Sequence, residues 1–275
     1  MNACPGGEGD GHGRGLAPMT SVTIDLSGKV ALVTGGAYGM GRAAARRFAS
    51  CGARVAVADV DVARGLETVE MITKDGGRAL FIEADVSLSA SVQDMIGQVV
   101  AEYGRLDYAH NNAGIIEGQL SIHEYPDDQW DRIIANNLTS VFLCMKHEIP
   151  VMLAQGGGAV VNVASETTYK GNAGDAAYTA SKHGVWGLTT VAALRYVKRN
   201  IRVNAIAPGN VRTGITERAQ AVTPPEIWQQ IERANPIGRL IEPAEIAELV
   251  VWLCSDQAAL VNGTLVAADT GWHVA

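Results

Sequence analysis

A tyrosine and a lysine four residues apart, Tyr178 and Lys182, form the pair in this sequence that is best suited to acid–base chemistry. Residues at this spacing share one face of a helix, where an ammonium group favours the phenolate and lowers the pKa of the tyrosine. Such a phenol could take a proton from an alcohol or give one to a ketone. Ser165, which ends an apolar run thirteen residues earlier, could hold the reacting oxygen. Because the Tyr-Lys spacing alone is a frequent coincidence, its interpretation depends on the rest of the chain.

A glycine-rich segment, Thr34–Gly41, has the composition of a turn that binds phosphate groups. It follows an apolar run and leads into a stretch with helical periodicity. Glycines permit a tight turn and a close approach to a pyrophosphate, and the first N–H groups of the helix would face the phosphates. The alternative is a glycine-rich turn without a ligand. The residues that we expect to contact a dinucleotide here are Gly35, Tyr38, Gly39, Met40 and Gly41.

Asp59 ends the second apolar run, where a carboxylate can accept hydrogen bonds from both hydroxyl groups of an adenosine ribose. The carboxylate would repel a 2′-phosphate, and the next residue is Val60 rather than an arginine that could compensate. We therefore expect NAD, and not NADP, to be the cofactor. A cap on the following helix is the alternative role for Asp59.

Short apolar runs alternate with longer amphipathic stretches, which predicts a parallel sheet covered by helices on both faces. We expect strands at residues 29–34, 54–58, 79–82, 106–109, 159–163, 201–206 and 264–268. We expect helices at residues 42–51, 62–74, 89–103, 127–153, 177–198 and 243–254, with a break or bend near Asn136-Asn137. This pattern predicts a doubly wound α/β sheet of the Rossmann type, with about seven strands in one domain over residues 21–275. Residues 1–20 are polar and rich in glycine, so we expect a flexible tail there.

Two further segments follow the third and fourth predicted strands. Asp85-Val86 follows the third, and Asn111-Asn112-Ala113-Gly114 follows the fourth. The carboxyl ends of parallel strands lie at one edge of the sheet, where ligands bind in open α/β folds. Taken singly, each segment is more often a simple turn.

The glycine-rich turn, the Asn-Asn-Ala-Gly segment, Ser165, the Tyr-Lys pair and Pro208-Gly209 occur in a characteristic order and at characteristic intervals. Together they resemble the short-chain dehydrogenase/reductase family, in its compact single-domain branch, over residues 26–272. At residues 269–271, Asp-Thr-Gly replaces the family's common Asp-Gly-Gly, which puts the local turn in question.

The resemblance implies a role for each residue of the catalytic set. Tyr178 is expected to be the general acid/base, and Lys182 to lower its pKa and bind the nicotinamide ribose. Ser165 is expected to position the reacting oxygen, and Asn137 to support a proton-relay water. The resemblance implies cofactor contacts at Gly35, Gly39, Gly41, Asp59, Asp85, Val86, Asn112, Ala113, Gly114, Pro208, Gly209, Val211 and Thr213.

The expected function is an NAD-dependent oxidoreductase that interconverts a secondary alcohol, cyclic alcohols included, and a ketone by hydride transfer. One alternative is a 3-ketoacyl-carrier reductase, although such enzymes usually prefer NADP, which Asp59 opposes. The other is a non-catalytic NAD-sensing protein, although such a protein usually loses the tyrosine or the lysine first. Substrate selectivity is expected in residues 166–174 and in a lid over residues 213–237.

Composition and charge exclude several other classes. The net charge of −7 argues against a nucleic-acid partner. No apolar run is long enough to span a bilayer and no secretory signal is present, so a cytoplasmic location is expected. The scattered cysteines and histidines predict no metal site. By resemblance, the helices at about residues 137–153 and 177–198 are expected to pair in a homotetramer, with a homodimer as the second choice.

Overall fold

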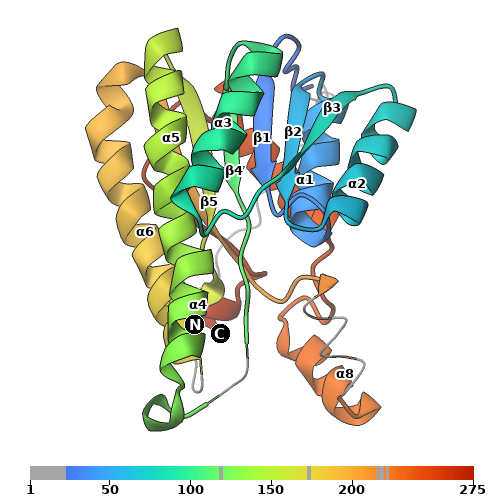
Figure 1. Cartoon of the computed structure of the whole chain (residues 1–275). Coiled ribbons are helices and arrows are strands. Elements are labelled where there is room, and N and C mark those ends of the chain that lie inside the picture. Colours follow the sequence, from blue (N-terminus) through green and yellow to red (C-terminus); the bar gives the residue numbers. More distant parts are fainter. Residues whose placement is uncertain (1–22, 118–119, 172–174, 215, 217–219, 221–222) are drawn as a thin grey trace, which may run out of the picture.

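The computed structural model describes residues 23–117, 120–171, 175–214, 216, 220 and 223–275. In this part of the chain, seven parallel strands form one sheet with the order β3-β2-β1-β4-β5-β6-β7 (Figure 1). The strands are β1 (Val30–Thr34), β2 (Arg54–Asp59), β3 (Arg78–Glu83), β4 (Tyr108–Asn111), β5 (Gly158–Val163), β6 (Ile201–Pro208) and β7 (Leu265–Ala268). The strand order reverses between β1 and β4, which is where doubly wound sheets bind ligands. The predicted fold class is confirmed.

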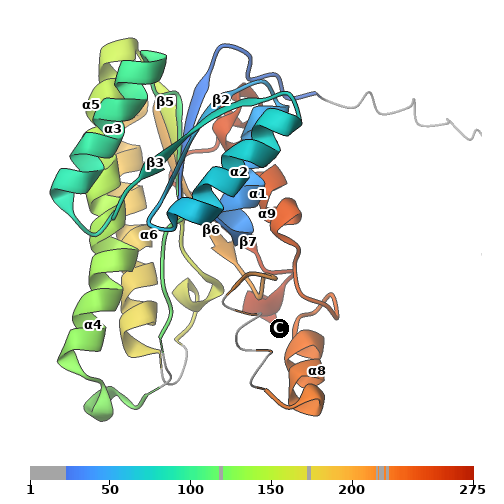
Figure 2. The same ribbon diagram turned by 45° about the vertical axis from the view of Figure 1, so that its right-hand side comes forward.

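Helices cover both faces of the sheet (Figures 1 and 2). They are α1 (Gly39–Ser50), α2 (Val62–Lys74), α3 (Ser89–Tyr103), α5 (Ser140–Gln155), α6 (Ala176–Tyr196) and α9 (Pro243–Cys254). Successive side chains of a strand point to opposite faces. Val30 and Leu32 of β1 accordingly pack in the core cluster under α3, α5 and α6. Ala31 and Val33 pack in the second cluster, under α1, α2 and α9. The strands are apolar along their length because both faces are buried.

Most of the predicted elements occur close to their expected positions, and α2, α3 and α9 have the predicted bounds. The fourth strand begins at Tyr108, two residues later than expected. The reason is Gln155, whose Oε1 accepts a hydrogen bond from the Leu106 N–H (3.1 Å) and whose Nε2 donates to the Leu106 carbonyl (2.6 Å). The side chain of Gln155 thus forms the hydrogen bonds with the Leu106 N–H and carbonyl that a neighbouring strand would otherwise form.

The long helical region is interrupted, as predicted, at the two asparagines. The helix α4 (Asp127–Ile134) and α5 are joined by a π-helical turn over Ala135–Thr139. A π turn inserts one extra residue into a helix and often marks a functional position. Here it contains Asn137, which is fully buried.

The segment at 213–237 includes the helix α8 (Pro225–Ala234). Both α4 and α8 extend beyond one end of the sheet (Figure 1). Trp228 of α8 is buried and its Nε1 donates to Glu232 Oε1 (3.1 Å), so this side chain packs within the segment. The predicted tail at 1–20, the loop at 172–174 and Ile215 lie outside the described residues. Across the described part of the chain, no helix has the length and apolar character needed to cross a membrane.

Candidate active site

A cavity of about 440 Å³ lies at the carboxyl ends of β1, β2, β3 and β4. Twelve of the predicted cofactor residues line it: Gly35, Tyr38, Gly39, Met40, Asp59, Val60, Asp85, Val86, Asn112, Ala113, Gly114 and Thr213. Arg64, Ile115 and Asn136 also line the cavity and were not predicted. Six segments that are separate in the sequence therefore meet around one space.

The turn after β1 depends on glycine at two positions. Gly39 has a φ of +55°, in the left-handed region that other residues rarely adopt. A Cβ atom on Gly41 would lie 2.0 Å from the carbonyl oxygen of Gly35, so any larger residue would force the turn open. The backbone at the start of α1 is therefore open to a ligand phosphate, as the composition predicted.

Asn112 holds this turn against the end of β4. Its Nδ2 donates to the carbonyl oxygens of Thr34 (2.9 Å) and Gly35 (3.1 Å). Its backbone N–H donates to Thr34 Oγ1 (3.1 Å), as does that of Ala113 (3.2 Å). Asn112 thus has a positioning role that the sequence did not reveal, in addition to lining the cavity.

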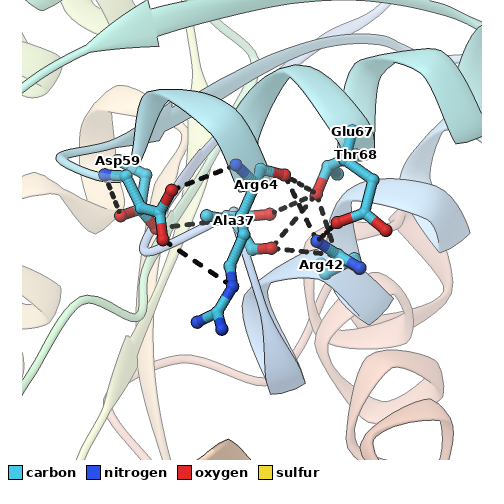
Figure 3. Close-up of polar contacts among 8 residues, drawn as sticks. Ala37, Arg42, Asp59, Arg64, Glu67 and Thr68 are labelled. Carbon is cyan, nitrogen blue, oxygen red and sulfur yellow. Dashed lines mark hydrogen bonds and ion pairs between the residues drawn. The ribbon is translucent and has the colours of Figure 1, made fainter.

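Asp59 accepts two backbone hydrogen bonds, one on each carboxylate oxygen (Figure 3). The donors are the N–H groups of Ala37 (2.9 Å) and Asp61 (3.0 Å). The cap of α2 is Asp61, whose Oδ1 accepts from the Arg64 N–H, so the alternative role of Asp59 as the helix cap is wrong. Each oxygen of Asp59 keeps a further lone pair for a ligand hydroxyl.

Tyr38 lines the cavity, and two guanidinium groups lie near its ring. Arg42 and Arg64 lie 5.5 Å and 5.3 Å from the centre of its ring, within cation–π range. Arg42 is itself fixed, because its Nε donates to the Ala37 carbonyl (2.9 Å). Only the tertiary structure reveals Arg64 as part of the site, since an exposed basic residue on a helix carries no signal in the sequence.

The catalytic set lies at the start of α6 and the end of β5. Lys182 Nζ donates to the carbonyl of Val163 (2.8 Å) and lies 5.5 Å from the centre of the Tyr178 ring. The side chain of Ser165 lies close enough to that of Tyr178 to lower the pKa of the phenol. The predicted tyrosine, lysine and serine are therefore adjacent in space.

The largest effect on the pKa of Tyr178 in this structure is burial, and the predicted lowering by Lys182 stays a prediction. Burial raises the pKa of Tyr178 to about 12, and the hydrogen bond with Ser165 opposes this change only in part. Burial also lowers the pKa of Lys182 to about 8. Desolvation disfavours the charged form of each group and outweighs their mutual effect. The phenol keeps its proton at neutral pH, which suits a proton donor.

Asn137 connects the π turn to the loop after β4. Its Oδ1 accepts from the N–H of Ile115 (2.7 Å) and its Nδ2 donates to the Ile115 carbonyl (2.8 Å). A Cβ atom on Gly114 would lie 3.1 Å from Asn137 Oδ1 and 3.7 Å from Lys182 Nζ. The loop that lines the cavity is therefore also the loop that contacts the catalytic set.

The segment after β6 returns to the turn after β1. The N–H of Gly209 donates to the carbonyl of Ala268 (3.1 Å), and Val211 forms a bridge with Ile241. A Cβ atom on Gly39 would lie 3.2 Å from Thr213 Cγ2, so Thr213 covers the phosphate turn. Pro208, Gly209 and Val211 lie outside the lining of the cavity and position this segment.

Comparisons with known proteins agree with this geometry. Residues 35–273 match the family model described as enoyl-(acyl carrier protein) reductase. A short-chain dehydrogenase/reductase of Aspergillus oryzae is 41% identical over 250 residues, which cover 90% of this chain and 96% of the relative. A 2,5-dichloro-2,5-cyclohexadiene-1,4-diol dehydrogenase of Sphingobium indicum is 40% identical over 90% of this chain and 98% of its own length. The crystal structure of levodione reductase matches with a TM-score of 0.86 and 36% identity, covering 90% of this chain and 99% of that one.

Proposed function

This chain belongs to the short-chain dehydrogenase/reductase family, and we propose that it is an NAD-dependent enzyme that interconverts a secondary alcohol and a ketone. Relatives named for the oxidation of a cyclic diol and the reduction of levodione support cyclic substrates. The observation that carries the proposal is the contact of Tyr178 with Ser165, beside Lys182 and next to the loop that lines the cavity.

The nicotinamide cofactor supplies the hydride acceptor in oxidation and the hydride donor in reduction. Tyr178 gives its phenolic proton to the forming alkoxide in reduction, and takes the alcohol proton in the reverse direction. Ser165 holds the same oxygen by a hydrogen bond and fixes its distance from the phenol. Lys182, held by the Val163 carbonyl, places its ammonium near the Tyr178 ring and would bind the nicotinamide ribose of the cofactor.

Asp59 supports NAD as the cofactor. Its carboxylate is oriented by the N–H groups of Ala37 and Asp61, and it keeps lone pairs for both ribose hydroxyls. A 2′-phosphate at the same place would meet this negative charge. The narrow glycine turn and the cavity of about 440 Å³ fit the phosphates and the adenosine part of a dinucleotide.

The test is the reduction of NAD and of NADP, measured separately, with a panel of secondary and cyclic alcohols near pH 9. We expect turnover with NAD. Replacing Asp59→Ala should lower kcat/KM for NAD by about tenfold or more, because hydrogen bonds to charged groups contribute about 1.5–3 kcal/mol each. Asp61→Ala is the matched control, since it removes the cap of α2 and leaves the cofactor preference unchanged.

The two alternatives give different results in the same experiment. Turnover mainly with NADP would favour the 3-ketoacyl-carrier reductase. Cofactor binding without turnover of any alcohol would favour the NAD-sensing protein.

We also propose a homotetramer in which α5 and α6 pair with their copies, with a homodimer as the second choice. Exposed apolar side chains on these helices support it, namely Phe142, Val191 and Leu194. Large exposed apolar residues that gather on one face mark interaction surfaces. Trp186 and His147, which the sequence placed at either this surface or the core, are half-buried.

A further inference from the structure

Glu166 directly follows Ser165 and begins a short 3₁₀ helix (Glu166–Thr168) beyond the carboxyl end of β5. Its Oε2 lies 3.4 Å from Ser165 Oγ. Its charge is close enough to Tyr178 to raise the pKa of that phenol. The carboxylate therefore stands beside the two groups that would hold the reacting oxygen.

The groups that face Glu166 do not neutralise it. Asp269, beyond the end of β7, adds a second negative charge, but its own oxygens accept from the N–H of Gly271 (3.0 Å) and the N–H of His273 (2.9 Å). Lys170 has only a small effect on the pKa of Glu166, because its Nζ lies over the Trp272 ring, 3.8 Å from the ring centre. Among the described residues, Glu166 forms no ion pair.

Glu166 consequently has an unused capacity to accept hydrogen bonds. The residue is only partly exposed, and its burial raises its pKa to about 7. The contact with Ser165, at 3.4 Å, is longer than the usual O–H···O distance of about 2.7–2.8 Å. A carboxylate that is removed from water in this way is stabilised by any ligand that brings a hydrogen-bond donor.

We propose that Glu166 binds the second hydroxyl group of a vicinal diol whose first hydroxyl is held by Ser165 and Tyr178. The inference rests on the proposed function and names its substrate class. The separation of 3.4 Å between Ser165 Oγ and Glu166 Oε2 places two oxygen atoms side by side, so that each can bind one of two neighbouring hydroxyl groups. The corresponding hydroxy-ketone would bind in the same way. A carboxylate on the substrate at this position would be repelled.

The experiment compares three substrates that differ only beside the reacting carbon: cis-1,2-cyclohexanediol, its mono-methyl ether and cyclohexanol, each with NAD near pH 9. The ether keeps the oxygen atom, loses the donor hydrogen and adds a methyl group, so the change of the ratio in Glu166→Leu, and not the wild-type ratio alone, reports the donor. For the wild-type protein we expect kcat/KM for the diol to exceed that for the ether by roughly tenfold or more. Glu166→Leu should abolish this preference, because it removes the acceptor of the second hydroxyl group, while the variant still oxidises cyclohexanol.

Two further variants separate binding from electrostatics. Glu166→Gln keeps an acceptor oxygen without the charge, so it should retain part of the preference for the diol. It also replaces Glu166→Leu if the leucine variant does not fold. Asp175→Asn is the matched control, because Asp175 also raises the pKa of Tyr178 but contacts neither oxygen of Glu166. It should shift the pH profile and leave the diol preference intact.

A wild-type protein that oxidises the diol and its ether equally well would overturn the inference, as would a preference that survives in Glu166→Leu. Either result leaves the proposed function standing, because cyclohexanol is still oxidised. Absence of turnover with every alcohol, cyclohexanol included, would instead contradict the proposed function and this inference with it.

Discussion

The protonation of Tyr178 controls the direction in which this site works most readily. A pKa of about 12 keeps the phenol neutral at pH 7, so reduction has its proton donor in place. Oxidation needs the phenolate. At pH values below the pKa, the phenolate fraction rises about tenfold for each unit by which the pH increases. We therefore expect kcat/KM for alcohol oxidation to rise from pH 7 to pH 10, while ketone reduction stays nearly constant.

Steady-state rates in both directions across this pH range test the expectation. Tyr178→Phe provides the control: turnover should fall by about 10²–10⁴-fold at every pH, since the proton donor is lost. Cofactor binding should persist. A phenylalanine variant with near-normal turnover would remove Tyr178 from its assigned role, and a flat oxidation profile would contradict the raised pKa.

Thr270 is a residue whose backbone is strained. It has a φ of +59°, in the left-handed region, where a β-branched side chain is unfavourable. The threonine thus adopts a conformation that glycine, the residue of the common Asp-Gly-Gly sequence at this position, adopts without strain. We expect Thr270→Gly to raise the free energy of unfolding by about 1 kcal/mol.

Denaturant unfolding measures this gain. Asn200 is the matched control, with the same φ of +59°, but asparagine tolerates this conformation and its Nδ2 donates to the Gly156 carbonyl (3.2 Å). Asn200→Gly should therefore give no increase. Equal effects of the two substitutions would argue against strain at Thr270.

At the scale of elements, α5 carries an ionisable group that is packed into the core. Glu148 is fully buried against β4, where Asn111 Nδ2 donates to its Oε2 (3.2 Å). Burial raises its pKa from the ordinary value of 4.5 to about 8. The folded protein thus holds the proton that the unfolded chain releases above about pH 4.5. Stability should fall as pH rises from about 4.5 to about 8, because folding binds a proton in this window.

Glu148→Gln removes this titration. Relative to wild type, its unfolding midpoint should rise progressively between pH 5 and pH 8, as followed by thermal melts at several pH values. Glu102→Gln is the control on α3, since that carboxylate is exposed and should show a constant difference. A parallel pH dependence for wild type and Glu148→Gln would mean that the buried carboxyl group does not control this loss of stability.

In a single subunit, α6 carries apolar side chains that are exposed on the surface of the molecule. Val191 and Leu194 are 67% and 82% exposed. In the proposed tetramer, a charge at this position would be buried without a partner, which is strongly unfavourable. Leu194→Asp should therefore reduce the assembly to a smaller oligomer in light scattering. Leu66→Asp on α2, also at an exposed leucine, should leave the mass unchanged. An unchanged mass for Leu194→Asp would exclude α6 from the interface.

The local structure of this chain could be predicted from its sequence. The strands, the helices and the position of the bend at Asn137 could be predicted, because periodicity and composition are local properties of the chain. The meeting of Gly35, Asp59 and Asn112 around one cavity follows from the same pattern, since parallel strands bring their carboxyl ends to one edge.

The sequence by itself therefore determined the fold and the order of the motifs, and it predicted a tyrosine, a lysine and a serine that the fold brings together. The tertiary structure decided the electrostatics: the raised pKa of Tyr178, the guanidinium groups of Arg42 and Arg64 around Tyr38, and the isolation of Glu166 beside Ser165. The physical reason is desolvation, which depends on how segments far apart in the chain pack around each group and leaves no periodic trace in the sequence.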